Sequence, residues 1–268
     1  MHGRTTIILL TAVAAALALA AGATRATAAD TSVYQVWLQR GGRLWVVKRE
    51  QPVTMSPARA AVRSLLAGPT VAEADAGVAT QVPSGTDLLG LGVADGTATV
   101  DVSDRFGAGS GAASVRMRLA QLTYTLTQFP AIDRVRLLID GRAASRLTSD
   151  RVPVPEPMTR TTWAGLMPAI TVWNPPIGTH LSGSVRVTGS ADVFEASLHI
   201  RILNAAGRTI ARADTTASCG SGCWGGYTVQ VPFTVVKDQL GIIVVADDDA
   251  DGNGAPQHQV RVPVVLLA

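Results

Sequence analysis

Three aspartates near the end of the chain, Asp247, Asp249 and Asp251, alternate with other residues and are followed by Gly252. Alternate carboxylates before a turn-forming glycine are typical of the first half of a calcium loop. The twelfth position holds His258 instead of a closing acid, and the segment follows an expected strand rather than a helix. The aspartates are therefore a calcium candidate, and a solvated hairpin tip explains the same pattern.

The chain has two cysteines, Cys219 and Cys223, which are separated by Gly-Ser-Gly. The flexible intervening residues allow so short a loop to close, and a disulfide is the usual state of such a pair in an oxidising compartment. Zinc binding by the two thiolates is the alternative, but zinc normally takes four protein ligands, and no second Cys/His pair lies nearby in the sequence. We therefore expect a disulfide.

Three aromatic residues in the C-terminal part, Trp173, Trp224 and Tyr227, are candidates for a binding surface. Exposed aromatic rings that stack on sugars would suit a peptidoglycan- or glycan-binding module. Core packing is the alternative that we favour, because β-sandwich domains commonly bury a tryptophan.

Candidate general bases are His180, His199 and His258, but no Gly-x-Ser-x-Gly motif accompanies them. Residues 107–112 form Gly-x-Gly-x-x-Ala, an incomplete dinucleotide-binding motif. The strands around this motif are expected to form hairpins, and nicotinamide cofactors are scarce outside the cytoplasm. We therefore expect no catalytic residues, no cofactor and a non-enzymatic protein.

The elements that position these residues divide into two regions. The first, residues 30–142, predicts an α+β domain of β-hairpins packed with two helices. Its hairpins are signalled by Gly41-Gly42 and Asp95-Gly96, and its first helix by Ser56-Pro57 at the start and Gly68-Pro69 at the end. We expect strands at 32–39, 43–50, 87–94, 97–103 and 133–139, and helices at 57–67 and 112–128.

The second region, residues 170–268, predicts an all-β immunoglobulin-like sandwich of seven short strands. The expected strands lie near 170–174, 184–190, 195–203, 208–216, 226–235, 241–247 and 258–267. Between the two regions, residues 143–169 contain Pro153, Pro155 and Pro157, which predict an extended, semi-rigid linker.

Residues 1–29 predict a secretory signal peptide, with a basic start, an apolar run over 7–21 and an Ala-x-Ala cleavage site at 26–28. The run is shorter than the roughly 20 residues of a spanning helix, so we expect cleavage and no integral membrane segment afterwards. Without the signal the chain has 21 basic and 20 acidic residues, and it has no basic stripe. This balance makes nucleic acid a poor partner candidate.

Eight short stretches of the sequence resemble a known pair of domains. The first region resembles the GerMN domain of bacterial sporulation and spore-germination proteins, and the second resembles the immunoglobulin-like domain often found after GerMN. The chain departs from many relatives in lacking a lipobox cysteine and in having the Cys219/Cys223 loop. The stretches that carry the resemblance lie at 65–69, 82–86, 98–103, 124–130, 135–141, 170–176, 187–191 and 194–196.

This resemblance implies an extracytoplasmic, envelope-associated protein without established enzymatic activity, which suggests scaffolding or protein–protein assembly related to germination, sporulation or envelope maintenance. The implied partners are an unidentified envelope protein or a second copy of the chain. The alternative function is binding of peptidoglycan or another cell-wall glycan.

Overall fold

The computed structural model describes residues 30–248 and 255–268. The expected signal peptide and two residues of the calcium candidate, Asp249 and Asp251, lie outside the described residues. Within the described part, no helix is both long and apolar enough to cross a membrane.

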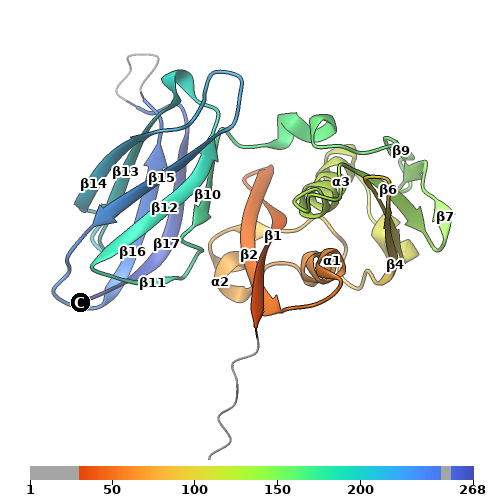
Figure 1. Cartoon of the computed structure of the whole chain (residues 1–268), viewed down its shortest axis with the longest axis horizontal. Coiled ribbons are helices and arrows are strands. Elements are labelled where there is room, and N and C mark those ends of the chain that lie inside the picture. The colour runs from red at the N-terminus through yellow and green to blue at the C-terminus, as the bar shows by residue number, and fades with distance from the viewer. Residues whose placement is uncertain (1–29, 249–254) are drawn as a thin grey trace, which may run out of the picture.

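The N-terminal region contains two sheets, with strand orders β2-β1-β3 and β4-β5-β6-β7. Helices α1 and α3 lie between the β1–β2 hairpin and the sheet that contains β4 and β6 (Figure 1). Strands β5 and β6 are parallel and are connected through α3, whereas the β1–β2 and β4–β5 pairs are antiparallel. The elements are β1 (Thr31–Arg40), β2 (Arg43–Pro52), α1 (Pro57–Ala67), α2 (Val71–Asp75), β3 (Val78–Ala79), β4 (Leu88–Ala94), β5 (Thr97–Val102), η1 (Asp104–Gly107), α3 (Ala112–Leu126), β6 (Arg134–Ile139) and β7 (Arg142–Ala143).

Helix α3 is buried on nearly all sides because it lies between the two sheets. Its polar side chains therefore need partners, and they find them in neighbouring backbone. The Thr125 hydroxyl accepts a hydrogen bond from the Trp37 backbone N–H at 3.0 Å, and the Gln121 carboxamide accepts one from the Gln81 N–H at 2.9 Å. These bonds fix the helix against β1 and the segment after β3 at little cost from the buried polar groups.

The segment 143–169 is not the extended spacer that its prolines predict. It forms β8 (Arg146–Leu147), β9 (Val152–Pro153) and the 3-10 helix η2 (Thr161–Leu166), and Val152, Met158 and Trp163 are buried in the N-terminal core. Met158 also exchanges two backbone hydrogen bonds with Val135 of β6. The burial of these apolar side chains anchors the segment, and the prolines stiffen a chain that is already packed.

The C-terminal region is a sandwich of two sheets, ordered β10-β12-β15 and β11-β17-β16-β13-β14, with a core of aliphatic side chains between them. This confirms the predicted α+β domain followed by an immunoglobulin-like sandwich. Its elements are β10 (Ile170–Asn174), β11 (His180–Ser182), β12 (Ser184–Ala191), η3 (Phe194–Ala196), β13 (Ser197–Leu203), β14 (Thr209–Thr216), β15 (Gly225–Pro232), β16 (Gln239–Ala246) and β17 (Gln259–Leu267).

The β1–β2 hairpin connects the two regions. Trp45 of β2 packs against both hydrophobic cores, and β10 runs beside β2 (Figure 1). Arg40 donates a hydrogen bond to the Arg261 carbonyl of β17 at 2.7 Å, and Arg43 donates one to the Gly165 carbonyl. The sandwich and the α+β region therefore share a contact surface, and the hairpin forms one side of it.

Candidate binding groove between the domains

A groove with a volume of about 800 Å³ lies where the β1–β2 hairpin, the end of α3 and the segment 143–169, called the connector below, meet the sandwich. It is called the interdomain groove below. This volume is within the range of small-molecule binding sites. The groove residues that matter for its chemistry are Gln35, Trp37, Lys48, Gln128, Arg160, Met167, Trp173, Ser190 and Trp224.

Trp173 and Trp224, two of the three aromatic residues predicted as a binding surface, both line this groove. Trp224 is 40% exposed, and its indole N–H donates a hydrogen bond to the Pro168 carbonyl at 3.1 Å. That bond fixes the ring plane while leaving one part of the ring in solvent. Trp173, on β10, is half-buried, and its indole N–H has no hydrogen-bond partner among the described residues.

Tyr227, the third of these residues, is not on the surface. It is only 4% exposed, and its hydroxyl donates a hydrogen bond to the Thr171 carbonyl at 2.7 Å. The ring crosses from β15 over Gly189 of β12, where an added Cβ would lie 2.5 Å from the tyrosine oxygen. Burial raises the pKa of Tyr227 far above its usual range. The hydrogen bond of Tyr227 therefore links β15 to β10, and its side chain belongs to the core.

Arg160 brings a positive charge to the groove. Its guanidinium lies 4.7 Å from the ring centre of Tyr124 and 5.9 Å from that of Trp37, and it donates a hydrogen bond to the Thr127 hydroxyl at 2.9 Å. Partial burial lowers the pKa of Arg160, which remains a cation at neutral pH. Within residues 30–248 and 255–268, neither Arg160 nor Lys48 forms an ion pair with a carboxylate.

The cysteine loop borders the same groove. Cys219 and Cys223 form the expected disulfide, with their Cα atoms 6.0 Å apart, and Trp224 follows directly. Gly225 packs so closely on this loop that an added Cβ would lie 2.2 Å from the Cys219 nitrogen. The Gly222 N–H also donates to the Asp192 carboxylate at 2.6 Å. These contacts hold Trp224 at the edge of the groove.

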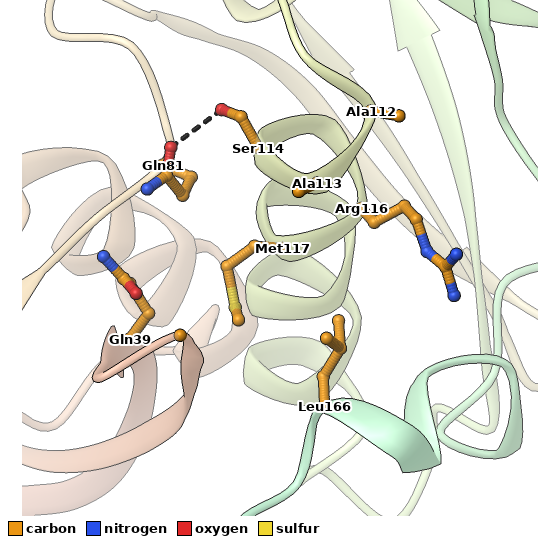
Figure 2. A pocket seen from close by; sticks show the side chains of 9 residues that line it. Gln39, Gln81, Ala112, Ala113, Ser114, Arg116, Met117 and Leu166 are labelled. Atoms are coloured by element: carbon orange, nitrogen blue, oxygen red, sulfur yellow. Dashed lines mark hydrogen bonds between the residues drawn. The ribbon is translucent and has the colours of Figure 1, made fainter.

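A second pocket, of about 440 Å³, lies beside the first turns of α3. Figure 2 shows Met117 of α3 facing Gln39 of the hairpin, with Leu166 of η2 nearby and the Ser114 hydroxyl hydrogen-bonded to Gln81. The lining is mainly apolar. The polar side chains at its border include Gln81 and Ser114, which are hydrogen-bonded to each other.

In the glycine-rich segment before α3, the Gly111 amide is not available to a phosphate. The Gly111 N–H at the start of the helix donates to the Asp150 carboxylate at 2.6 Å, so a side chain of the protein occupies the position of an anion. Arg118 binds the Phe106 and Ala108 carbonyls of the same segment. The segment is therefore fastened to the connector and to α3.

The histidine and aspartate side chains near the end of β16 pair with one another. His199 contacts Asp214 through Nδ1 at 2.6 Å and Asp248 through Nε2 at 2.5 Å. Hydrogen bonds to Asp248 and then to Asp214 raise the pKa of His199. Because both ring nitrogens are engaged, this histidine has no nitrogen left to activate a nucleophile.

The calcium candidate is represented in the described residues by Asp247 alone. Its Oδ1 accepts the His258 backbone N–H and its Oδ2 contacts His258 Nδ1, each at 2.7 Å. No cluster of three or more metal-ligating side chains occurs among the residues that the structure describes. Calcium binding by Asp247, Asp249 and Asp251 remains a prediction.

Two family models match the chain. The model of a sporulation and spore germination domain, Germane, matches residues 16–145, and that of an immunoglobulin-like domain of bacterial spore germination, Gmad2, matches residues 169–253. No curated protein gives a significant match.

The solved structures to which the chain is similar include GerMN domains. The first GerMN domain of the sporulation protein GerM from Bacillus subtilis is 25% identical, with 48% of this chain and 98% of that one covered and a TM-score of 0.41. The tandem GerMN domains of the same protein are 16% identical, with 76% and 62% covered and a TM-score of 0.45. A protein from Clostridium perfringens described as a lipoprotein is 18% identical, with 53% and 98% covered and a TM-score of 0.37. The two family matches together span most of the sequence, and the chain combines a sporulation and spore germination domain with a C-terminal immunoglobulin-like domain of bacterial spore germination.

Proposed function

We propose that this protein is exported to the cell envelope, where it acts without catalysis by assembling with another envelope protein or with a second copy of itself. Both of its domains are of the sporulation and germination type, which supports a germination-associated role. The export signal expected at 1–29 and the disulfide of the sandwich support an extracytoplasmic location.

The observation that carries the assembly proposal is the edge strand β4. It ends the four-stranded sheet of the N-terminal domain, so one side of its backbone has no partner strand in the described structure. Its sequence, Leu-Leu-Gly-Leu-Gly-Val-Ala, contains no charged residue and no proline. Leu89 is 51% exposed and Val93 is 43% exposed.

Soluble proteins usually protect such edges with charges, prolines or a covering element. A seven-residue apolar edge without charges or prolines is suited to strand addition. In strand addition, backbone hydrogen bonds join two chains and exposed side chains add apolar contact. Arg59 of α1 reaches the Leu91 carbonyl at 3.5 Å, and this long contact would be easily displaced.

The polar side chains support a non-enzymatic role. The histidine with a raised pKa, His199, is held between two carboxylates, and the Gly111 N–H at the start of α3 is already bonded to the Asp150 carboxylate. A hydrolase would need a histidine nitrogen that is free to act as a base, and a nucleotide enzyme would need free amides at the helix start. In this protein the His199 nitrogens and the Gly111 N–H are bonded to carboxylates of the chain itself.

The proposal is tested by crosslinking intact cells and identifying what is recovered with the protein. Val93→Lys places a charge on the β4 edge and should abolish the crosslinked complex, while the matched variant Val236→Lys, at a position that is 95% exposed in a loop, should retain it. Recovery of monomer alone from wild-type cells, or equal complexes from both variants, would refute assembly through β4.

A further inference from the structure

The interdomain groove is built from parts of both domains. Trp37 comes from β1, Lys48 from β2 and Arg160 from the connector, whereas Trp173 lies on β10 of the sandwich and Trp224 precedes β15. A ligand in this groove would therefore touch both domains at once. This is a different surface from the β4 edge, so the two can be tested independently.

The charges of the groove favour an anion. Lys48 and Arg160 line it, its lining contains no aspartate or glutamate, and neither cation is paired within the described residues. Lys48 is one of two lysines in the chain. Two unpaired cations in a concave surface attract carboxylates and exclude cationic ligands.

The aromatic side chains favour a ligand with flat apolar faces. Trp224 presents an exposed ring whose orientation is fixed by its bond to the Pro168 carbonyl. The indole N–H groups of Trp37 and Trp173 are shielded from solvent, so they are not donors for a ligand in the groove.

Together these features describe a sugar acid. A pyranose ring has an apolar face that fits an indole and, in a uronic acid, a carboxylate for the two cations. We propose that the interdomain groove binds an acidic saccharide, with sugar rings on Trp224 and Trp173 and the carboxylate at Arg160 and Lys48. An acidic peptide shares only the carboxylates with this ligand, because it lacks the flat sugar face.

The proposal can be tested by titrating the disulfide-intact chain with three probes of similar length. The probes are a hyaluronan tetrasaccharide, which alternates uronic acid with an N-acetyl sugar, the neutral chitotetraose, and tetraglutamate. Calorimetry should show saturable binding of the hyaluronan fragment, at least tenfold weaker binding of chitotetraose, and no binding of tetraglutamate. The affinity for the hyaluronan fragment should fall as salt rises, since two charges take part.

Variants locate the binding in the groove. Trp224→Ala should lower the affinity for the hyaluronan fragment at least tenfold. Lys48→Gln should lower this affinity severalfold and make it less dependent on salt. The matched variants Phe194→Ala, which also removes an exposed aromatic ring of the sandwich, and Lys237→Gln should bind like the wild type. Circular dichroism of each variant verifies that it is folded.

Absence of saturable binding by the hyaluronan fragment at millimolar concentration would overturn the proposal, as would unchanged binding by folded Trp224→Ala. Tetraglutamate that binds as tightly as the saccharide would identify a peptide site instead. None of these results affects the crosslinking test of β4, so failure here and failure of the assembly proposal are distinguishable.

Discussion

Replacing Tyr227 by phenylalanine tests whether this residue belongs to the core or to a binding surface. The side chain is 4% exposed, and its hydroxyl donates to the carbonyl of Thr171, a residue that is itself 3% exposed. Tyr227→Phe keeps the ring but leaves that carbonyl without this donor. The loss of such a buried hydrogen bond costs about 1–2 kcal/mol, whereas a surface substitution would cost less than about 0.5 kcal/mol.

The assay is reversible thermal unfolding of the disulfide-intact protein, followed by near-UV circular dichroism. A loss of about 1.5 kcal/mol lowers Tm by roughly 3–6 °C in a protein of this size that unfolds as one unit. The matched control is Tyr34→Phe, because the Tyr34 hydroxyl is buried and has no partner among the described residues. Its removal should leave Tm unchanged or raise it. A shift below about 1 °C for Tyr227→Phe, or an equal loss in the control, would refute the assignment.

Three further predictions concern ionic and covalent contacts. Burial acts to raise the pKa of Glu73, but hydrogen bonds from Arg49 at 2.7 Å and from Thr70 outweigh it, and the pKa is lowered. The ionised Glu73 carboxylate therefore stabilises the folded protein, and this stabilisation is lost as pH falls through the lowered pKa. Glu73→Ala should therefore cost about 3 kcal/mol in urea unfolding at pH 7, and less in acid. The pKa of His199 is raised in the folded protein, so the protonated histidine adds to the free energy of unfolding. This contribution is complete below about pH 6.5 and is lost as pH rises through the pKa of the folded protein, so His199→Asn should flatten the stability–pH profile there. Reduction of the disulfide, or serine at either cysteine, should cost about 2 kcal/mol, the chain-entropy estimate for so short a loop, as measured by unfolding with and without reductant.

The elements with strong local signals were predicted well. The helix at 57–67 agrees with α1 because Ser56-Pro57 and Gly68 mark its ends, and the hairpin turns at Gly41-Gly42 and Asp95-Gly96 occur as expected. The short helix α2 was missed, although Thr70 and Glu73 form a capping box that the sequence displays. Strand β11 was missed because its three residues carry no periodic pattern.

The groove could be predicted only in part. Trp173 and Trp224 were identified as surface candidates, but Tyr227 is buried, since residue type alone does not reveal that Gly189 leaves room for its ring. Trp37 and Arg160 were not identified, because they come from separate elements that only the packing of the two domains brings together. The connector was misinterpreted for a similar reason, since its prolines were visible and the core that receives Trp163 was not.

Assembly through β4 is tested most directly by cysteine crosslinking in intact cells. The two native cysteines are paired, so a new thiol at Val93 would react specifically, and neighbouring strands bring opposite side chains within about 5.5 Å. With a short crosslinker that attaches to the thiol at one end and is photoreactive at the other, Val93→Cys should yield a defined species of higher mass, and Val236→Cys, in an exposed loop, should yield none. Monomer alone at position 93, under conditions in which its thiol is shown to be accessible, would contradict the account.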